Sequence, residues 1–90
     1  MITRFQIRAE AEAASLVRLL DPFAQRGLVP SAVSATCVDD DLEVVIDMPL
    51  LDEGIAAQIC ARMGNMIAVL SASAKALGEQ QAGRSVASLA

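Results

Sequence analysis

The sequence predicts an α+β fold in which a four-stranded antiparallel sheet carries two helices on one face. Two observations lead to this prediction. The hydrophobic period switches between about two and about 3.6 along the chain, in the order β-α-β-β-α-β. The chain has 90 residues, enough for one domain with one core. This element order is the split βαβ pattern, for which we expect the strand order 4-1-3-2.

The first part of the chain predicts a strand and then a helix. In residues 3–10 apolar and polar side chains alternate, with an inner face of Phe5, Ile7 and Ala9. From about Glu12 the apolar residues take helical spacing, at Leu16, Leu19, Leu20 and Phe23. Gly27 suits the end of this helix, beside Arg26. Pro22 removes one helical hydrogen bond, so we expect the helix either to kink or to split, with Asp21 as a new N-cap.

The middle of the chain predicts a β-hairpin. Residues 28–38 alternate as a second strand, and Pro30 near its start favours an edge position because proline has no N–H to donate. The run Asp39-Asp40-Asp41 is expected to form the turn. A third strand then alternates from Leu42 to Met48 and ends at Pro49.

The remaining elements are a second helix and a fourth strand. Asp52 is a good N-cap, and Ile55, Ile59 and Met63 follow at helical spacing. Gly64-Asn65 ends the helix, and residues 67–74 are the fourth strand. From about Gly78 the sequence is polar and without pattern. We therefore expect one domain over residues 1–77 and a flexible C-terminal tail over residues 78–90.

The composition excludes several classes of function. The absence of His removes histidine acid–base catalysis, His-containing nucleophile arrangements and His-containing metal sites. A net charge of −4 and only two aromatic residues, both Phe, argue against nucleic-acid binding. The two cysteines, Cys37 and Cys60, form no CxxC pair and are expected to be half-buried thiols in a reducing compartment. Without a long apolar run or a signal-peptide pattern, we expect a soluble, cytoplasmic protein with no membrane partner.

This β-α-β-β-α-β arrangement is the ferredoxin-like fold, and the chemistries that it commonly hosts lack their residues here. The first loop, residues 9–15, has neither the CxxC of a metallochaperone nor the Gly-rich, Arg-containing cradle of an acylphosphatase. The Asp39-Asp40-Asp41 run is read as a solvated turn rather than a cation site. Glu10 and Glu12 are read as charges that favour a helix N-terminus rather than an acid–base pair. We predict no catalytic residue, no metal, no cofactor and no enzymatic activity; a small hydrolase is the least favoured alternative.

Assembly is a better-supported role. The expected edge strand has no lysine and no inward charge, although natural monomers usually protect such an edge. We therefore expect a homodimer that pairs through this strand across a two-fold axis. The alternative is that the tail or a neighbouring loop covers the edge. The expected interface residues are Val33, Ser34, Ala35, Thr36, Cys37 and Val38.

Two segments resemble the ACT domain family, in particular the small regulatory subunits of acetohydroxyacid synthase (acetolactate synthase). Residues 16–27, LVRLLDPFAQRG, resemble the first helix of those subunits, which ends in a similar Phe-x-x-Arg-Gly. Residues 58–70, QICARMGNMIAVL, resemble their second helix and last strand. The resemblance covers about residues 3–76, and the length is similar to that of the short, isozyme II-type subunits. It implies a ferredoxin-like ACT fold.

The resemblance also implies an effector site in the loop before the first helix. Valine-sensitive members usually carry Asn-x-x-Gly there, whereas Ala11 and Ala14 stand at the matching positions, a departure that fits the weakly valine-sensitive isozyme II type. The implied effector-binding residues are Glu12, Ala13, Ala14 and Ser15.

The leading hypothesis is a non-catalytic activating subunit that docks on the large catalytic subunit of a thiamine-diphosphate-dependent acetohydroxyacid synthase, in branched-chain amino-acid biosynthesis. The alternative is a stand-alone ACT module that senses a small amino acid and regulates another enzyme.

Overall fold

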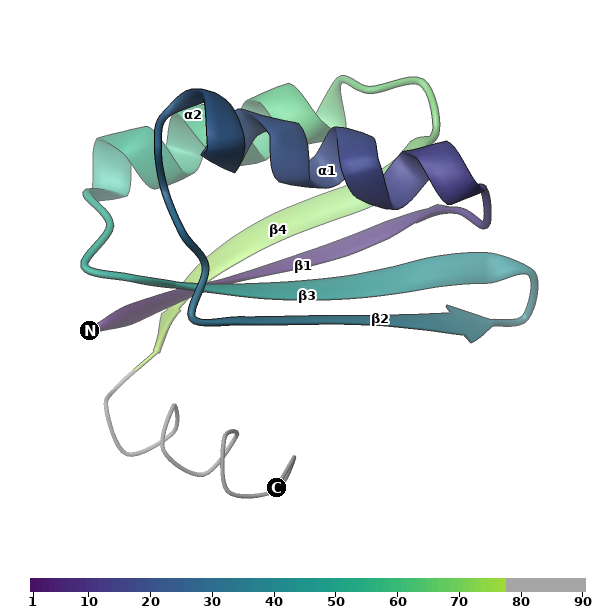
Figure 1. Cartoon of the computed structure of the whole chain (residues 1–90), viewed down its shortest axis with the longest axis horizontal. Helices are drawn as coiled ribbons and strands as arrows, with labels where there is room; N and C mark the ends of the chain where they lie inside the picture. Colours follow the sequence, from purple (N-terminus) through teal and green to yellow (C-terminus); the bar gives the residue numbers. More distant parts are fainter. Residues whose placement is uncertain (78–90) are drawn as a thin grey trace.

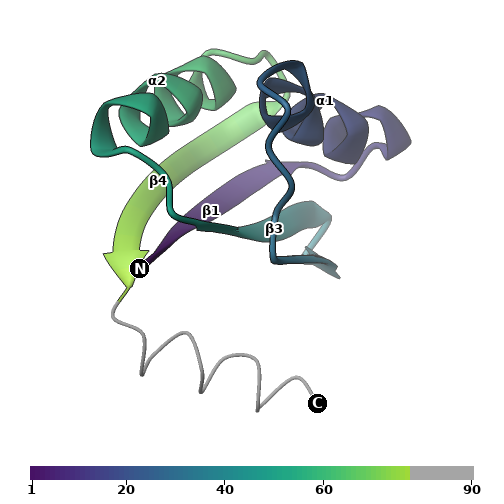
Figure 2. The ribbon, with the colours of Figure 1, turned by 60° about the vertical axis from the view of Figure 1, so that its left-hand side comes forward.

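The structure, a computed structural model that describes residues 1–77, has the predicted architecture. Its elements are β1 (Ile2–Glu10), α1 (Ala13–Gln25), β2 (Ala32–Val38), β3 (Asp41–Pro49), α2 (Glu53–Gly64) and β4 (Val69–Leu77). All strand pairs are antiparallel, and the sheet order is β2-β3-β1-β4. Both helices lie on the same face of the sheet (Figures 1 and 2). The predicted fold and strand order are confirmed; the predicted tail lies outside the described residues.

The core lies between the helices and the inner face of the two central strands. The alternation predicted for β1 is confirmed, because Phe5, Ile7 and Ala9 are all buried. The rings of Phe5 and Phe23 meet edge to face, with their centroids 5.1 Å apart. The other buried residues of this cluster come from β3 and both helices: Leu19, Val44, Ile46, Met48, Ala56, Ile59 and Met63.

Helix α1 passes through Pro22 without splitting, so the alternative of a second N-cap at Asp21 is wrong. The proline ring is itself buried in the core, and it removes only one hydrogen bond near the end of the helix. Beyond Arg26, Gly27 adopts the expected left-handed conformation, with φ of 68°. The N–H of Leu28 then donates to the carbonyl of Phe23 at 2.9 Å and closes the helix end.

Strand β2 begins at Ala32, four residues later than predicted. Leu28 is held by the end of α1, and Pro30 has no N–H to offer a neighbouring strand. Pairing starts only with Ser31, whose N–H donates to the carbonyl of Asp47 at 2.8 Å. The alternation of residues 28–31 therefore reflects a loop, because an alternating pattern alone does not say where hydrogen bonding begins.

The hairpin turn contains two residues rather than the predicted three. Asp39 and Asp40 have φ of 50° and 70°, as in a type I′ turn, whereas Asp41 already pairs with Val38 as the first residue of β3. Aspartate tolerates the left-handed region better than most side chains do, which explains how the turn forms without glycine.

The second half of the fold follows its predicted signals with one shift. Asp52 caps α2, its carboxylate accepting from the N–H groups of Gly54 and Ile55 at 2.9 and 3.2 Å. Strand β4 spans Val69–Leu77 rather than residues 67–74, because a turn closed by the Val69 N–H and the Met66 carbonyl comes first. Within residues 1–77, no helix has both the length and the apolarity to cross a membrane.

Candidate functional site

Strand β2 is an open edge of the sheet. Among residues 1–77 it pairs only with β3, in a register that places Val33 opposite Ile46 and Ala35 opposite Val44. Both β3 residues are buried, yet their β2 neighbours on the same face are exposed. The helices thus cover the inner face of β3 but not that of β2, which leaves an uncovered apolar row beside the core: Val33, Ala35 and Cys37.

The exposure of Cys37 follows from this position and corrects the prediction of a half-buried thiol. Cys60, on α2, is half-buried as predicted. Both thiols are free. The other predicted interface residues, Ser34, Thr36 and Val38, alternate with the apolar row and therefore lie on the opposite face of β2.

The two edges of the sheet differ in their protection. Strand β4, the other edge, carries Lys75, and its pairing with β1 shifts register between Arg8 and Ala9. Charged side chains and bulges are the usual devices that stop an edge from pairing with another chain. Strand β2 has neither feature, so of the two edges it is the one suited to pairing.

The loop before α1 leaves the start of that helix without a side-chain cap. Glu12 stands at the N-cap position but accepts no hydrogen bond with its side chain, and the first turn contains no acidic residue. By contrast, Asp52 satisfies two N–H groups of α2. The first turn of α1 therefore presents N–H groups that a ligand oxygen can accept from.

The start of α1, which has no side-chain cap, and the open edge of β2 both border one groove. A pocket of about 280 Å³ is bounded by the loop, by α1 and by the hairpin, with these residues lining it: Ala11, Glu12, Ala13, Leu16, Cys37 and Leu42. Two of the four predicted effector residues, Glu12 and Ala13, thus lie beside one predicted interface residue, Cys37. Of the described residues that form this lining, Glu12 alone is charged.

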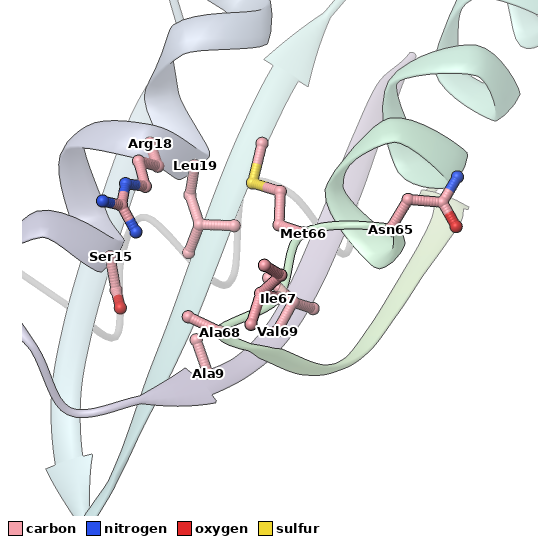
Figure 3. Close-up of a pocket in the computed structure, with 9 residues that line it drawn as sticks. All are labelled: Ala9, Ser15, Arg18, Leu19, Asn65, Met66, Ile67, Ala68 and Val69. Atoms are coloured by element: carbon pink, nitrogen blue, oxygen red, sulfur yellow. The ribbon is translucent and has the colours of Figure 1, made fainter.

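The predicted effector residues do not all face this groove. The buried hydroxyl of Ser15 donates to the carbonyl of Glu10 at 2.9 Å and fixes the loop against the helix. Ser15 lines a different pocket, of about 300 Å³, between α1 and the segment that joins α2 to β4 (Figure 3). Ala14 lines neither pocket. No local pattern in the sequence indicates this second pocket, because most of its wall is the connection from Asn65 to Val69, which the pattern predicts as a helix end and a strand start.

The acidic turn lies at the tip of the hairpin, where Asp39 and Asp40 are exposed to solvent. Arg8 forms an ion pair with Asp41 and donates a hydrogen bond from Nε to Oδ2 at 2.7 Å, and this hydrogen bond raises the pKa of Arg8. Among residues 1–77, no three Cys, Asp or Glu side chains come together in a way that could hold a metal ion.

Three comparisons relate this geometry to known proteins. The model of a protein family described as an ACT-like domain matches residues 1–81. No curated protein matches the chain. Among 34 matching chains of solved structures is the C-terminal domain of the MgtC protein from Mycobacterium tuberculosis. That domain is similar in fold, with a TM-score of 0.70 over 90% of this chain and 92% of its own, at 10% sequence identity.

Proposed function

Because this chain belongs to the ACT-like domain family, we propose that it is a non-catalytic regulatory module that dimerises through β2 and controls a separate enzyme in the cytoplasm. The observation that carries the proposal is the open edge, whose apolar row continues the inner face of the sheet without a helix to cover it.

Pairing of β2 with β2 of a second copy would satisfy the free N–H and C=O groups of this edge. An antiparallel pair across a two-fold axis would extend the sheet to eight strands and bring the two rows of Val33, Ala35 and Cys37 together. The outer ends of that sheet would be the two β4 edges, which carry Lys75. Assembly would therefore stop at the dimer rather than continue as a filament.

For the controlled enzyme we propose a thiamine-diphosphate-dependent acetohydroxyacid synthase, with this chain as its small subunit. The resemblance of residues 16–27 and 58–70 to those small subunits supports the assignment. The likeness to the MgtC domain shows the fold alone and does not bear on the partner. Such a subunit would activate by binding the active conformation of the catalytic subunit more tightly than the inactive one.

The lining of the groove supports a proposal that valine has little effect on this subunit. Among the described residues, its lining offers no basic side chain for the carboxylate of an amino acid, and Glu12 is its one charged side chain. Ala11 and Ala14 supply neither a side-chain hydrogen bond nor the backbone freedom of glycine. The response to valine is therefore proposed to be weak or absent.

One feature favours the second candidate, a stand-alone module that senses an amino acid. The uncapped N–H groups at the start of α1 lie beside the groove and could bind the α-carboxylate of an effector, while Glu12 could hold its ammonium group. In a dimer, β2 of the other copy would form the remaining wall.

The oligomeric state tests the dimerisation through β2, which both candidate functions require. Light scattering after gel filtration should give a dimer for the wild type. Ala35→Lys places a charge in the middle of the apolar row and should give a monomer. Ser73→Lys, which adds the same charge on β4, is the matched control and should remain a dimer. A monomeric wild type would refute the proposed interface.

An activity assay separates the two candidates. The acetohydroxyacid synthase large subunit of the same organism is assayed with and without this protein, and again with added valine. Stimulation that valine does not change supports the small-subunit proposal. If the protein neither stimulates nor co-elutes with the large subunit, the small-subunit role is refuted; saturable binding of a free amino acid by the isolated dimer would then support the sensor.

A further inference from the structure

A second pocket opens on the other flank of α1, away from β2. It has a volume of about 300 Å³ and is lined by Ala9 of β1, by three residues of α1 and by the segment from Asn65 to Val69. The walls are mainly aliphatic, as Figure 3 shows for Leu19, Met66 and Val69. A concave, apolar site with few polar groups is the usual form of a small-molecule site.

The one charged side chain of this pocket has no partner in the described part of the chain. Arg18 makes no hydrogen bond or ion pair there, whereas each of the other described arginines has a side-chain partner: Arg4, Arg8, Arg26 and Arg62. Figure 3 shows the Arg18 guanidinium on the α1 side of the pocket, beside Ser15. An unpaired guanidinium at the rim of an apolar pocket is suited to a carboxylate.

The same lining disfavours an amino acid. None of the described residues that line it is acidic, and the Ser15 hydroxyl already donates to the carbonyl of Glu10. The ammonium group of an amino acid would lose water without gaining a counter-charge. A ligand with a carboxylate at one end and only hydrocarbon at the other is complementary to this pocket, because Arg18 can bind the carboxylate and the aliphatic walls can contact the hydrocarbon.

We propose that this pocket binds a short aliphatic monocarboxylate, with its carboxylate on Arg18 and its hydrocarbon against Leu19, Met66 and Val69. The site is separate from the groove beside β2, since the two lie on opposite flanks of α1 and share no lining residue. It therefore goes beyond the proposed regulatory function and does not depend on it.

The test is a titration of the isotope-labelled full-length chain, followed by NMR chemical shifts. The probe is hexanoate, compared with 2-aminohexanoate, which adds an ammonium group to the same chain, and with 1-hexanol, which lacks the charge. Hexanoate should shift the signals of Leu19, Met66 and Val69 with a Kd of about 1 mM, as expected for so small a ligand. The 2-aminohexanoate should bind about tenfold more weakly.

Variants test the role of Arg18. Arg18→Gln should weaken hexanoate binding about fivefold, as expected for one solvent-facing ion pair, whereas Arg18→Lys should retain part of the affinity. Lys75→Gln removes the same charge outside the pocket and should bind as the wild type does. The proposal is refuted if hexanoate shifts no pocket signal, if 1-hexanol or 2-aminohexanoate binds equally well, or if Arg18→Gln binds unchanged.

Discussion

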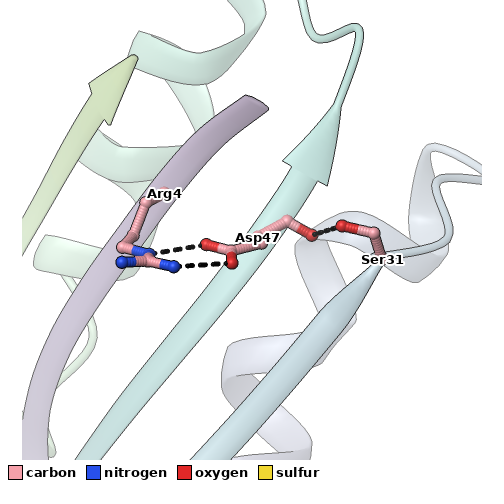
Figure 4. Close-up of polar contacts among 3 residues, drawn as sticks. All are labelled: Arg4, Ser31 and Asp47. Atoms are coloured by element: carbon pink, nitrogen blue, oxygen red, sulfur yellow. Dashed lines mark hydrogen bonds and ion pairs between the residues drawn. The ribbon is translucent and has the colours of Figure 1, made fainter. Parts of the chain in front are cut away.

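Replacement of Arg4 by Met should destabilise the protein, because it leaves a buried carboxylate without its partner. Arg4 on β1 holds Asp47 on β3 through two hydrogen bonds, from Nε to Oδ1 at 2.8 Å and from Nη2 to Oδ2 at 2.9 Å (Figure 4). The Asp47 side chain is only 7% exposed and accepts no other hydrogen bond from the described residues. The backbone carbonyl of Asp47 also accepts hydrogen bonds from the N–H and the hydroxyl of Ser31, the residue that precedes β2.

The expected loss is about 2–3 kcal/mol of unfolding free energy. Removal of one partner of a fully buried ion pair costs about 3–5 kcal/mol, and we take a lower value because water reaches the exposed part of Arg4. That part is 23% of its side chain. For a domain of this size the loss corresponds to a fall in Tm of roughly 8–24 °C. The hydrogen bonds that Arg4 donates to Asp47 raise the pKa of Arg4 above its ordinary value.

Urea unfolding at one fixed protein concentration measures the effect, with an unchanged m-value as the sign of an unchanged unfolded state. Arg8→Met is the matched control, because Arg8 forms a similar pair with Asp41 from the same strand but with side chains 45% and 25% exposed. Its stability should stay near that of the wild type. The double variant Arg4→Met, Asp47→Leu should recover most of the loss. The reasoning is refuted if Arg4→Met costs no more than Arg8→Met.

Three further predictions concern single elements of the fold, each measured by the same urea unfolding. Asp52→Ala removes the cap that accepts from two N–H groups of α2 and should cost about 1 kcal/mol. Asp40→Gly relieves a left-handed φ of 70° in the hairpin turn and should stabilise the protein by about 0.5–1 kcal/mol; a loss would show that Asp40 is needed for a contact. Phe23→Ala empties the centre of the core and should cost about 3–5 kcal/mol, whereas the exposed Val17→Ala should stay within about 0.5 kcal/mol of the wild type.

Much of the fold could be predicted because its local signals agree with one another. The inner face of β1, the cap at Asp52 and the glycine after α1 each depend on a few neighbouring residues, and the structure confirms all three. Two departures from the prediction lie where a distant contact decides the outcome. Pro22 continues its helix because the ring is buried in the core, and β2 starts late because the Asp47 carbonyl sets its first hydrogen bond.

The candidate site was predictable only in part. The absence of lysine from β2 is visible in the sequence, and so is the alanine-rich loop before α1. That Glu12 and Cys37 line one groove while Ser15 faces the opposite flank of α1 depends on the packing of that helix. One wall of the second pocket is formed by residues about 50 positions after those that α1 contributes. A pattern over a few neighbouring residues cannot indicate that two such distant segments come together.

The sequence by itself determined the order of the elements, the faces that become buried and the absence of histidine chemistry, because these follow from composition and from periodicity over a few residues. Within residues 1–77, the tertiary structure decided which strand lacks a helix above it, which arginine remains unpaired and which carboxylate is buried. These properties depend on the register between strands far apart in the chain, as between Arg4 and Asp47. They also depend on which of the four strands the two helices cover. Their physical origin is the burial of side chains by distant neighbours, which appears only when the chain is folded.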